Sequence, residues 1–118
     1  MKEFMAFIYS EGNHMAEMSP EEQQQHVERV GGYIQRLMEN GSMKSAQPLE
    51  MAGITISGTG SKLHDAPFNE TKEVIGGYYH LVADSLEAAA QIIKEDPRFE
   101  DGPWKIELRP VRVVEGIN

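Results

Sequence analysis

The chain has 118 residues, 40% of them apolar and 25% charged, which is the balance of one globular domain spanning residues 1–118. Its 19 acidic residues outnumber its 11 Lys and Arg residues, and the net charge of −8 argues against nucleic acid or an anionic membrane as a partner. The absence of cysteine excludes disulfides and thiolate chemistry and makes a reducing cytoplasm the simplest location, and no apolar run reaches the ~20 residues of a membrane-spanning helix.

The first predicted element is a strand from Phe4 to Tyr9, in which apolar and aromatic residues occupy both alternations. This pattern indicates a strand in the centre of a sheet, with both of its faces covered.

A helix is predicted to follow Ser19, because Pro20 suits the first helical position and Glu22 completes a capping box. The helix is expected to end at Asn40-Gly41, a left-handed C-cap. Gly31-Gly32 in its interior predict either a close approach of the helix to the sheet or a local bend. The apolar stripe that should face the core consists of Val27, Val30, Ile34, Leu37 and Met38.

Four more strands and a second helix are expected in the rest of the chain. Short strands are predicted at 43–49 and 54–58 and an extended piece at 62–65, and the best strand pattern covers Val74 to Val82. The second helix should begin with a capping box of Asp84 and Glu87 and end before Pro97. The last strand alternates from Trp104 to Arg109, and Pro110 predicts that it lies at a sheet edge or contains an irregularity.

The element order β-α-β-β-(β)-β-α-β, with short connections in the middle, predicts an α+β fold. We expect an antiparallel sheet with both helices on one face, which is the ferredoxin-like arrangement. The first strand and the Val74 to Val82 strand are apolar on both alternations, so the second face of the sheet should also be covered. A second copy of the chain would cover it, and we therefore expect a homodimer.

The densest polar stretch runs from His64 to Glu73 and precedes the best strand. Asp65 before Ala66-Pro67 is a natural turn opener, so an ordered surface turn is one interpretation. In the functional interpretation Asp65 and Glu70 face a cleft, where they orient a base or bind a ligand.

The histidines have competing interpretations. His26 lies at the flank of the apolar stripe of the first helix, where it is either a packing residue or, beside a carboxylate such as Asp65, a general base. His80 alternates with Tyr78 on one strand face, and it either lines a ligand cavity or lies in a dimer interface. No metal-ligand spacing, phosphate loop or nucleophile elbow occurs, so no metal or other cofactor is expected.

The segment from Asp65 to Tyr79 resembles the YCII-related proteins, and specifically the branch named for an Asp-Gly-Pro-Phe (DGPF) motif. The motif reads Asp65-Ala66-Pro67-Phe68 in this chain, with Ala66 in place of Gly, and Thr71-Lys72-Glu73 and Ile75-Gly76-Gly77-Tyr78 follow it. The resemblance extends through Ala83 to Ala89, the closing Ile106 to Val111 and the N-terminal strand and helix, so it covers nearly the whole chain.

The resemblance implies one ferredoxin-like, commonly dimeric domain. In the wider group a His and an Asp are the suggested active-site pair, and one branch looks like a lyase for chlorinated hydroxyquinols. His26 matches the helix-one histidine in placement and Asp65 matches the branch motif, whereas the stretch Gln47-Pro48-Leu49 contains no Asp. The branch is often encoded beside extracytoplasmic-function sigma factors, which implies a regulatory role.

These observations lead to one leading hypothesis and one alternative. In the first, the protein is a cytoplasmic lyase-like enzyme that binds a small organic ligand in a cavity between the first helix and the sheet. Proton abstraction would fall to His26 with Asp65, and the ligand would contact Phe68, Glu70, Tyr78 and His80. In the alternative, the chain is a non-enzymatic ligand-binding or regulatory module whose acidic surface contacts a protein.

Overall fold

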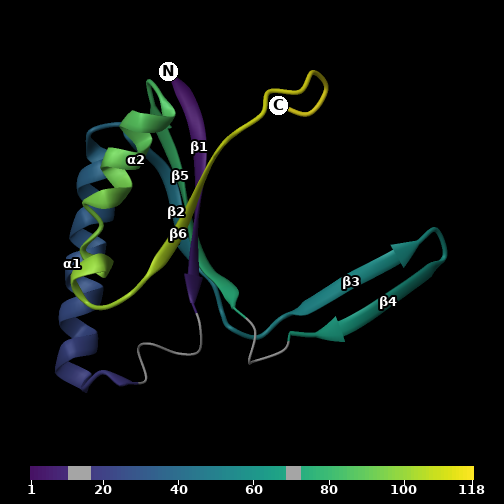
Figure 1. Ribbon diagram of the computed structural model, residues 1–118, viewed down its shortest axis with the longest axis horizontal. Coiled ribbons are helices and arrows are strands. Elements are labelled where there is room, and N and C mark those ends of the chain that lie inside the picture. Colours follow the sequence, from purple (N-terminus) through teal and green to yellow (C-terminus); the bar gives the residue numbers. More distant parts are fainter. Residues whose placement is uncertain (11–16, 69–72) are drawn as a thin grey trace.

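The computed structural model describes residues 1–10, 17–68 and 73–118, and it has an α+β architecture. One layer is an antiparallel sheet, and the second layer consists of two helices that lie on one face of that sheet (Figure 1). The elements are β1 (Lys2–Ser10), α1 (Pro20–Glu39), β2 (Met43–Pro48), β3 (Ile54–Thr59), β4 (Lys62–Pro67), β5 (Val74–Ala83), α2 (Leu86–Lys94), the 3-10 helix η2 (Pro97–Glu100) and β6 (Lys105–Pro110).

The main sheet has the strand order β2-β5-β1-β6, and every neighbouring pair is antiparallel. The strand β1 lies in the centre, as the sequence predicts, and β5, which also has apolar residues on both faces, lies beside it. The strand that ends at Pro110 lies at an edge, where a missing backbone N–H is tolerated. This order, with both helices on one face, is compatible with the ferredoxin-like arrangement.

The segments β3 and β4 depart from the expected single sheet. They pair only with each other and form a separate two-stranded hairpin, which projects away from the main sheet on the side opposite the helices (Figure 1). Every residue of both strands is exposed, so no core contact draws them into the main sheet. Two residues connect the strands, and the first of them, Gly60, has a φ of +60°.

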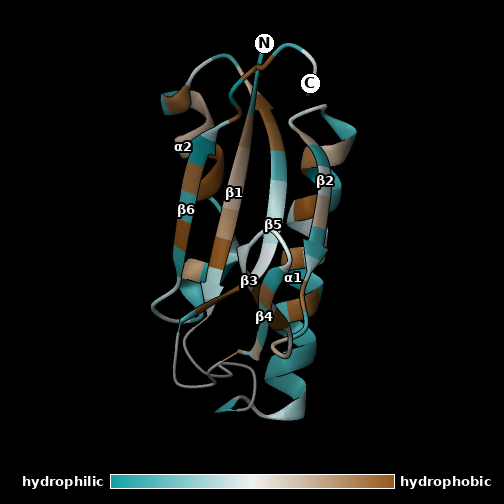
Figure 2. Ribbon diagram, turned by 90° about the vertical axis from the view of Figure 1, so that its right-hand side faces the viewer, coloured by the Kyte–Doolittle hydropathy of each residue, from teal (hydrophilic) through white to brown (hydrophobic). Residues whose placement is uncertain are grey.

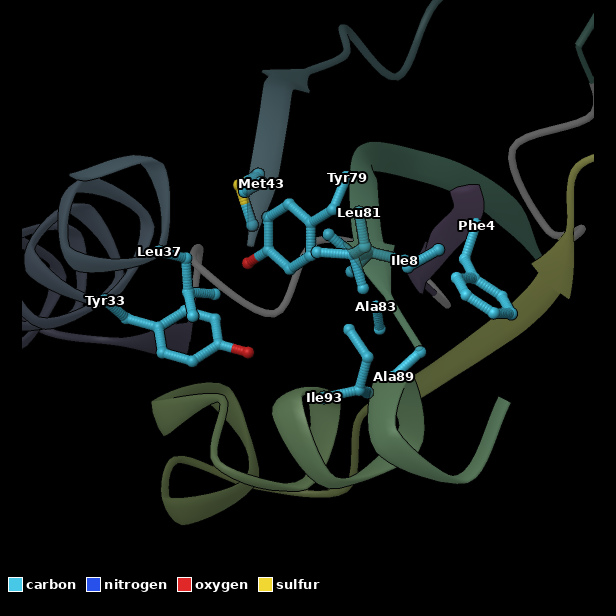
Figure 3. Close-up of a cluster of buried hydrophobic side chains, with 11 residues drawn as sticks. Phe4, Ile8, Tyr33, Leu37, Met43, Tyr79, Leu81, Ala83, Ala89 and Ile93 are labelled. Carbon is cyan, nitrogen blue, oxygen red and sulfur yellow. The ribbon is translucent and has the colours of Figure 1, made fainter. Parts of the chain in front are cut away.

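The core lies between the sheet and the helices (Figure 3). Alternate residues of β1 and β5 point into it, because side chains of a strand alternate between its faces. Tyr33 and Leu37 of α1 and Ile93 of α2 close the core from the helix side. The strand residues in the cluster are Phe4, Ala6, Ile8, Met43, Tyr79, Leu81 and Ala83.

Helix α1 begins as predicted, and the face that it turns to the core keeps Val30, Ile34 and Leu37 of the predicted stripe. The Ser19 hydroxyl accepts a hydrogen bond from the backbone N–H of Glu22 at 3.1 Å, and the Glu22 carboxylate accepts the Ser19 N–H at 3.3 Å. The buried stripe is His26, Val30, Tyr33 and Leu37, whereas Val27 and Met38 are exposed. His26 therefore lies in the packed face and not at its flank. A Cβ at either Gly31 or Gly32 would meet nothing within 4 Å, so these glycines do not mark a close helix–sheet approach.

Helix α2 is capped one residue later than predicted. Ser85 is the N-cap, and its hydroxyl accepts the Ala88 N–H at 3.1 Å, so Asp84 lies outside the helix. Ser85 has extended backbone angles of the kind that an N-cap requires. In the described part of the chain, neither helix is both long enough and apolar enough to cross a membrane.

Candidate functional site

A cavity of about 290 Å³ lies between α1, the sheet and η2. Apolar side chains form most of its wall, including those of Ile8, Val30 and Ile34. Four polar side chains also line it: His26 from α1, Gln47 from β2, Tyr79 from β5 and Arg98 from η2. A mostly apolar hollow with a few converging polar groups is the usual form of a small-molecule site.

His26 is only 5% exposed, and it pairs with a carboxylate that the loop between η2 and β6 supplies. Its Nδ1 lies 2.5 Å from Oδ2 of Asp101, and its ring stacks on the Trp104 ring at a centroid distance of 5.9 Å. The other carboxylate oxygen of Asp101 accepts a hydrogen bond from Nη2 of Arg29, one helical turn after His26. Asp101 is thus held by two donors from α1.

Asp101 fixes the protonation pattern of the imidazole. Burial raises the pKa of its carboxyl group, but the hydrogen bonds from His26 and Arg29 outweigh burial and hold the pKa below its ordinary value. An ionised carboxylate only accepts, so Nδ1 of His26 must carry the proton that joins them. In the neutral imidazole Nε2 is then the acceptor nitrogen, and no described residue forms a hydrogen bond with it.

The second polar group of the cavity is a buried network around Tyr79. Its hydroxyl donates to Oδ2 of Asp96 at 2.9 Å and accepts a hydrogen bond from Nη1 of Arg98. Asp96 is 2% exposed and also accepts the backbone N–H of Arg98, at 2.9 Å, so it caps η2. Burial raises the pKa of the Tyr79 phenol well above its ordinary value, and Tyr79 therefore stays protonated.

Arg98 has guanidinium N–H donors that form no hydrogen bond with the described residues. Its guanidinium lies 5.6 Å from the Tyr79 ring centroid and 5.7 Å from that of Trp104, which fixes its orientation. Of its three guanidinium nitrogens, only Nη1 forms side-chain hydrogen bonds within residues 1–10, 17–68 and 73–118. Because the described part of the chain contains no fully buried side-chain nitrogen without a partner, Nε and Nη2 remain accessible. Arg98 is also one of the residues that line the cavity.

The structure separates His26 from Asp65. Asp65 lies on β4, in the exposed hairpin, and the carboxylate beside His26 belongs to Asp101. Asp65 is also part of a strand and not the opener of a surface turn. The Ala66 variation of the motif is free of backbone strain, because no described residue other than glycine has a positive φ.

The remaining candidate residues lie elsewhere in the molecule. Phe68 and Tyr78 line a separate cavity of about 790 Å³ beside the base of the hairpin, on the sheet face opposite the helices. His80 also points to that face, and its Nε2 lies 2.7 Å from Oε1 of Glu3. Glu70 lies outside the described residues. Of the five candidates that the structure describes, His26 alone lines the cavity between α1 and the sheet.

The sequence patterns did not identify three residues of the site: Asp96, Arg98 and Asp101. A local signal existed for Asp101, since it precedes Gly102-Pro103 just as Asp65 precedes Ala66-Pro67. Asp96 precedes Pro97 and was a signal of the same kind. Turn openers before proline place a carboxylate where it accepts backbone N–H bonds, but nothing in sequence spacing says which helix such a loop contacts.

No group of three or more His, Asp or Glu side chains within the described ranges is arranged to hold a metal ion. Comparison with known families gives one match: the model of the YCII-related domain matches residues 2–114. Comparison with the curated proteins gives no match.

Proposed function

Because the chain belongs to the YCII-related domain family, we propose that it is a small-molecule enzyme in which His26 acts as the general base. The observation that carries this proposal is the 2.5 Å contact between Nδ1 of His26 and Asp101 at the wall of a cavity. A carboxylate that orients an imidazole and stabilises its charged form is the support that general bases use.

The proposed reaction is an elimination of the lyase type. In the keto tautomer of a chlorinated hydroxyquinol, Nε2 of His26 takes a proton from a hydroxyl group, and the electron pair of that O–H bond forms a carbonyl. The adjacent carbon–carbon double bond shifts by one position, and the leaving group departs with its own bonding pair from the tetrahedral ring carbon. Arg98 lies where its unused N–H groups can hold an anionic oxygen of the substrate and stabilise developing negative charge. The cavity volume of about 290 Å³ limits the substrate to a small organic molecule.

The test is turnover of a chlorinated hydroxyquinol, the substrate class that the family resemblance suggests, followed as released chloride. We expect wild type to release chloride and His26→Ala to lose at least about 100-fold in rate, the usual contribution of a general base. Asp101→Asn should retain substrate binding and lose rate, because the neutral amide lacks the negative charge that stabilises the protonated imidazole. His64→Ala, on the exposed hairpin, is the matched control and should be unchanged. Equal rates for wild type and His26→Ala would contradict the proposal.

We also propose finer assignments that rest on the sequence. The Asp65-Ala66-Pro67-Phe68 motif supports membership of the DGPF branch. The strand order β2-β5-β1-β6 supports a ferredoxin-like homodimer, in which a second copy covers the sheet face that the helices leave open. The absence of cysteine supports a reducing cytoplasm as the location.

A non-enzymatic regulatory module is the second candidate, and one observation favours it. The motif residues Asp65 and Phe68 are exposed and do not line the His26 cavity, as expected for a surface that contacts a protein. Calorimetric titration with an extracytoplasmic-function sigma factor from the same genome tests it. Binding that is weakened by Phe68→Ala and unaffected by His26→Ala would support this candidate, and absence of binding would remove it.

A further inference from the structure

The β3–β4 hairpin has one apolar face that no described residue covers. Residues that pair across an antiparallel ribbon share a face, so Ile54, Ile56 and Leu63 lie on the same side. Their exposed fractions are 60%, 62% and 59%. A two-stranded hairpin by itself is only marginally stable in water, and its apolar face needs a surface to pack against.

The sheet face away from the helices offers such a surface. Met5 and Phe7 of β1 and Tyr78 and Val82 of β5 lie on it and remain half-buried. Figure 2 looks onto this face, with the hairpin projecting in front of it. The projection also expands the chain: its radius of gyration is 16.4 Å, whereas a compact domain of this length has about 13.5 Å. A single copy thus presents two apolar surfaces that do not close on each other.

One charge on each surface can pair with a charge on the other, whereas the sheet-face carboxylates Glu3 and Glu107 already have partners in the same copy. Asp65 pairs with Ile56 in the register and therefore carries a carboxylate into the middle of the apolar hairpin face. Arg109 pairs with Met5, which places it on the open sheet face. Within the described ranges Arg109 forms no ion pair or hydrogen bond, whereas Lys105 on the same strand is already paired with Glu73. An acidic group on one apolar surface and an unpaired cation on the other favour contact between copies of the same chain.

We propose that the hairpin is an exchanged arm: the hairpin of each copy lies on the open sheet face of the other, with Asp65 paired to the partner's Arg109. This inference rests on the homodimer proposed above and adds its geometry. A two-fold axis relates the two arms, so each contact occurs twice. The arm also passes over the cavity of about 790 Å³ beside Phe7 and Tyr78, so that cavity is completed only when the second copy is present.

Sedimentation equilibrium of the full chain tests the arm separately from the dimer. Wild type should be a dimer, and Ile56→Asn should raise the dimer dissociation constant at least tenfold. His64→Asn is the matched control, because His64 pairs with Ser57 on the polar face of the same hairpin, and it should have no effect. A monomeric wild type would overturn both the dimer and the arm. A dimeric wild type with an unchanged Ile56→Asn variant would overturn the arm alone.

Charge reversal tests the ion pair. Asp65→Arg and Arg109→Asp should each raise the dimer dissociation constant at least tenfold, because each leaves two like charges facing each other. The double variant Asp65→Arg/Arg109→Asp restores the pair with opposite polarity and should recover wild-type association to within a few-fold. Single variants that associate like wild type, or a double variant as weak as the singles, would contradict the proposed pairing.

Discussion

Nδ1 of His26 lies 2.5 Å from Oδ2 of Asp101, and this contact joins the middle of α1 to the loop that enters β6. The side chains are 6% and 14% exposed, so the pair is largely removed from water. Arg29 binds the second oxygen of the same carboxylate, which leaves the Asp101 carboxylate between a cation and an imidazole. The site therefore depends on a fixed relation between one helix and one loop.

The first prediction concerns the pH dependence of stability. The pKa of Asp101 is lower in the folded protein than its ordinary value, which is near ~3.9 in an unfolded chain. The ionised carboxylate therefore stabilises the fold fully above about pH 4, and this contribution is lost as the pH falls through the folded-state pKa. Asp101→Asn should destabilise the protein by about 1–3 kcal/mol at pH 7 and by less at pH 3.

Urea unfolding of wild type and Asp101→Asn at a series of pH values between 3 and 7 measures this difference. Glu100→Gln serves as the control, because Glu100 is its exposed neighbour, with a side chain that is 74% exposed. A difference between wild type and Asp101→Asn that stays constant down to pH 3 would show that the charge of Asp101 does not stabilise the fold.

The main sheet and both helices could be predicted from the sequence because periodicity and capping are local. The capping box of Ser19 and Glu22 marks the start of α1. Apolar residues on both faces of β1 and β5 are typical of strands in the centre of a sheet. One detail of α1 was wrong for a local reason too. Val27 and His26 are adjacent, and hydrophobicity favoured Val27 for the core, whereas the Asp101 contact and Trp104 stacking bury His26.

The site could not be predicted, because its partners are far apart in sequence. His26 and Asp101 are separated by 75 positions, and only the path of the chain after η2 brings them together. Like Asp101, Asp65 stands two residues before a proline, where a carboxylate can open a turn, and it lies in a more distinctive motif. A single sequence does not show which of the two segments contacts α1, and the more distinctive motif pointed to Asp65 as the partner of His26.

The second prediction concerns the buried carboxylate of Asp96. It accepts hydrogen bonds from the Tyr79 hydroxyl and from Arg98, and it is 2% exposed. Asp96→Ala removes the buried carboxylate that accepts from Nη1 of Arg98 and from the Tyr79 phenol, so it should destabilise the protein by about 3–5 kcal/mol. Thermal unfolding measures this loss. Glu95→Ala, an exposed acidic neighbour, should change stability by less than about 0.5 kcal/mol, and equal effects of the two variants would contradict the network.

The third prediction distinguishes two possible caps of α2. Ser85 accepts the Ala88 N–H through its hydroxyl, whereas Asp84 precedes the cap. Ser85→Ala should therefore cost about 1 kcal/mol in the free energy of unfolding, and Asp84→Ala only a few tenths. Chemical denaturation of both variants gives the comparison directly. The reverse order of effects would mean that the helix begins one residue earlier, with Asp84 as its cap.

The fourth prediction concerns the geometry of the hairpin. Gly58 has a φ of +132°, in the left-handed region that side chains avoid, and a Cβ there would overlap the backbone oxygen of Lys62 on the paired strand. Gly58→Ala should therefore disturb the pairing of β3 with β4 while the main sheet stays intact.

Ser57→Ala is the matched control, since Ser57 is exposed and lies on the polar face of the same strand. Amide hydrogen exchange should accelerate by at least about tenfold in the hairpin of Gly58→Ala alone, since a loss of about 1.4 kcal/mol in local stability has that effect. Unchanged exchange in β3 and β4 would contradict the close approach, and accelerated exchange in β1 and β5 would mean that the hairpin supports the main sheet.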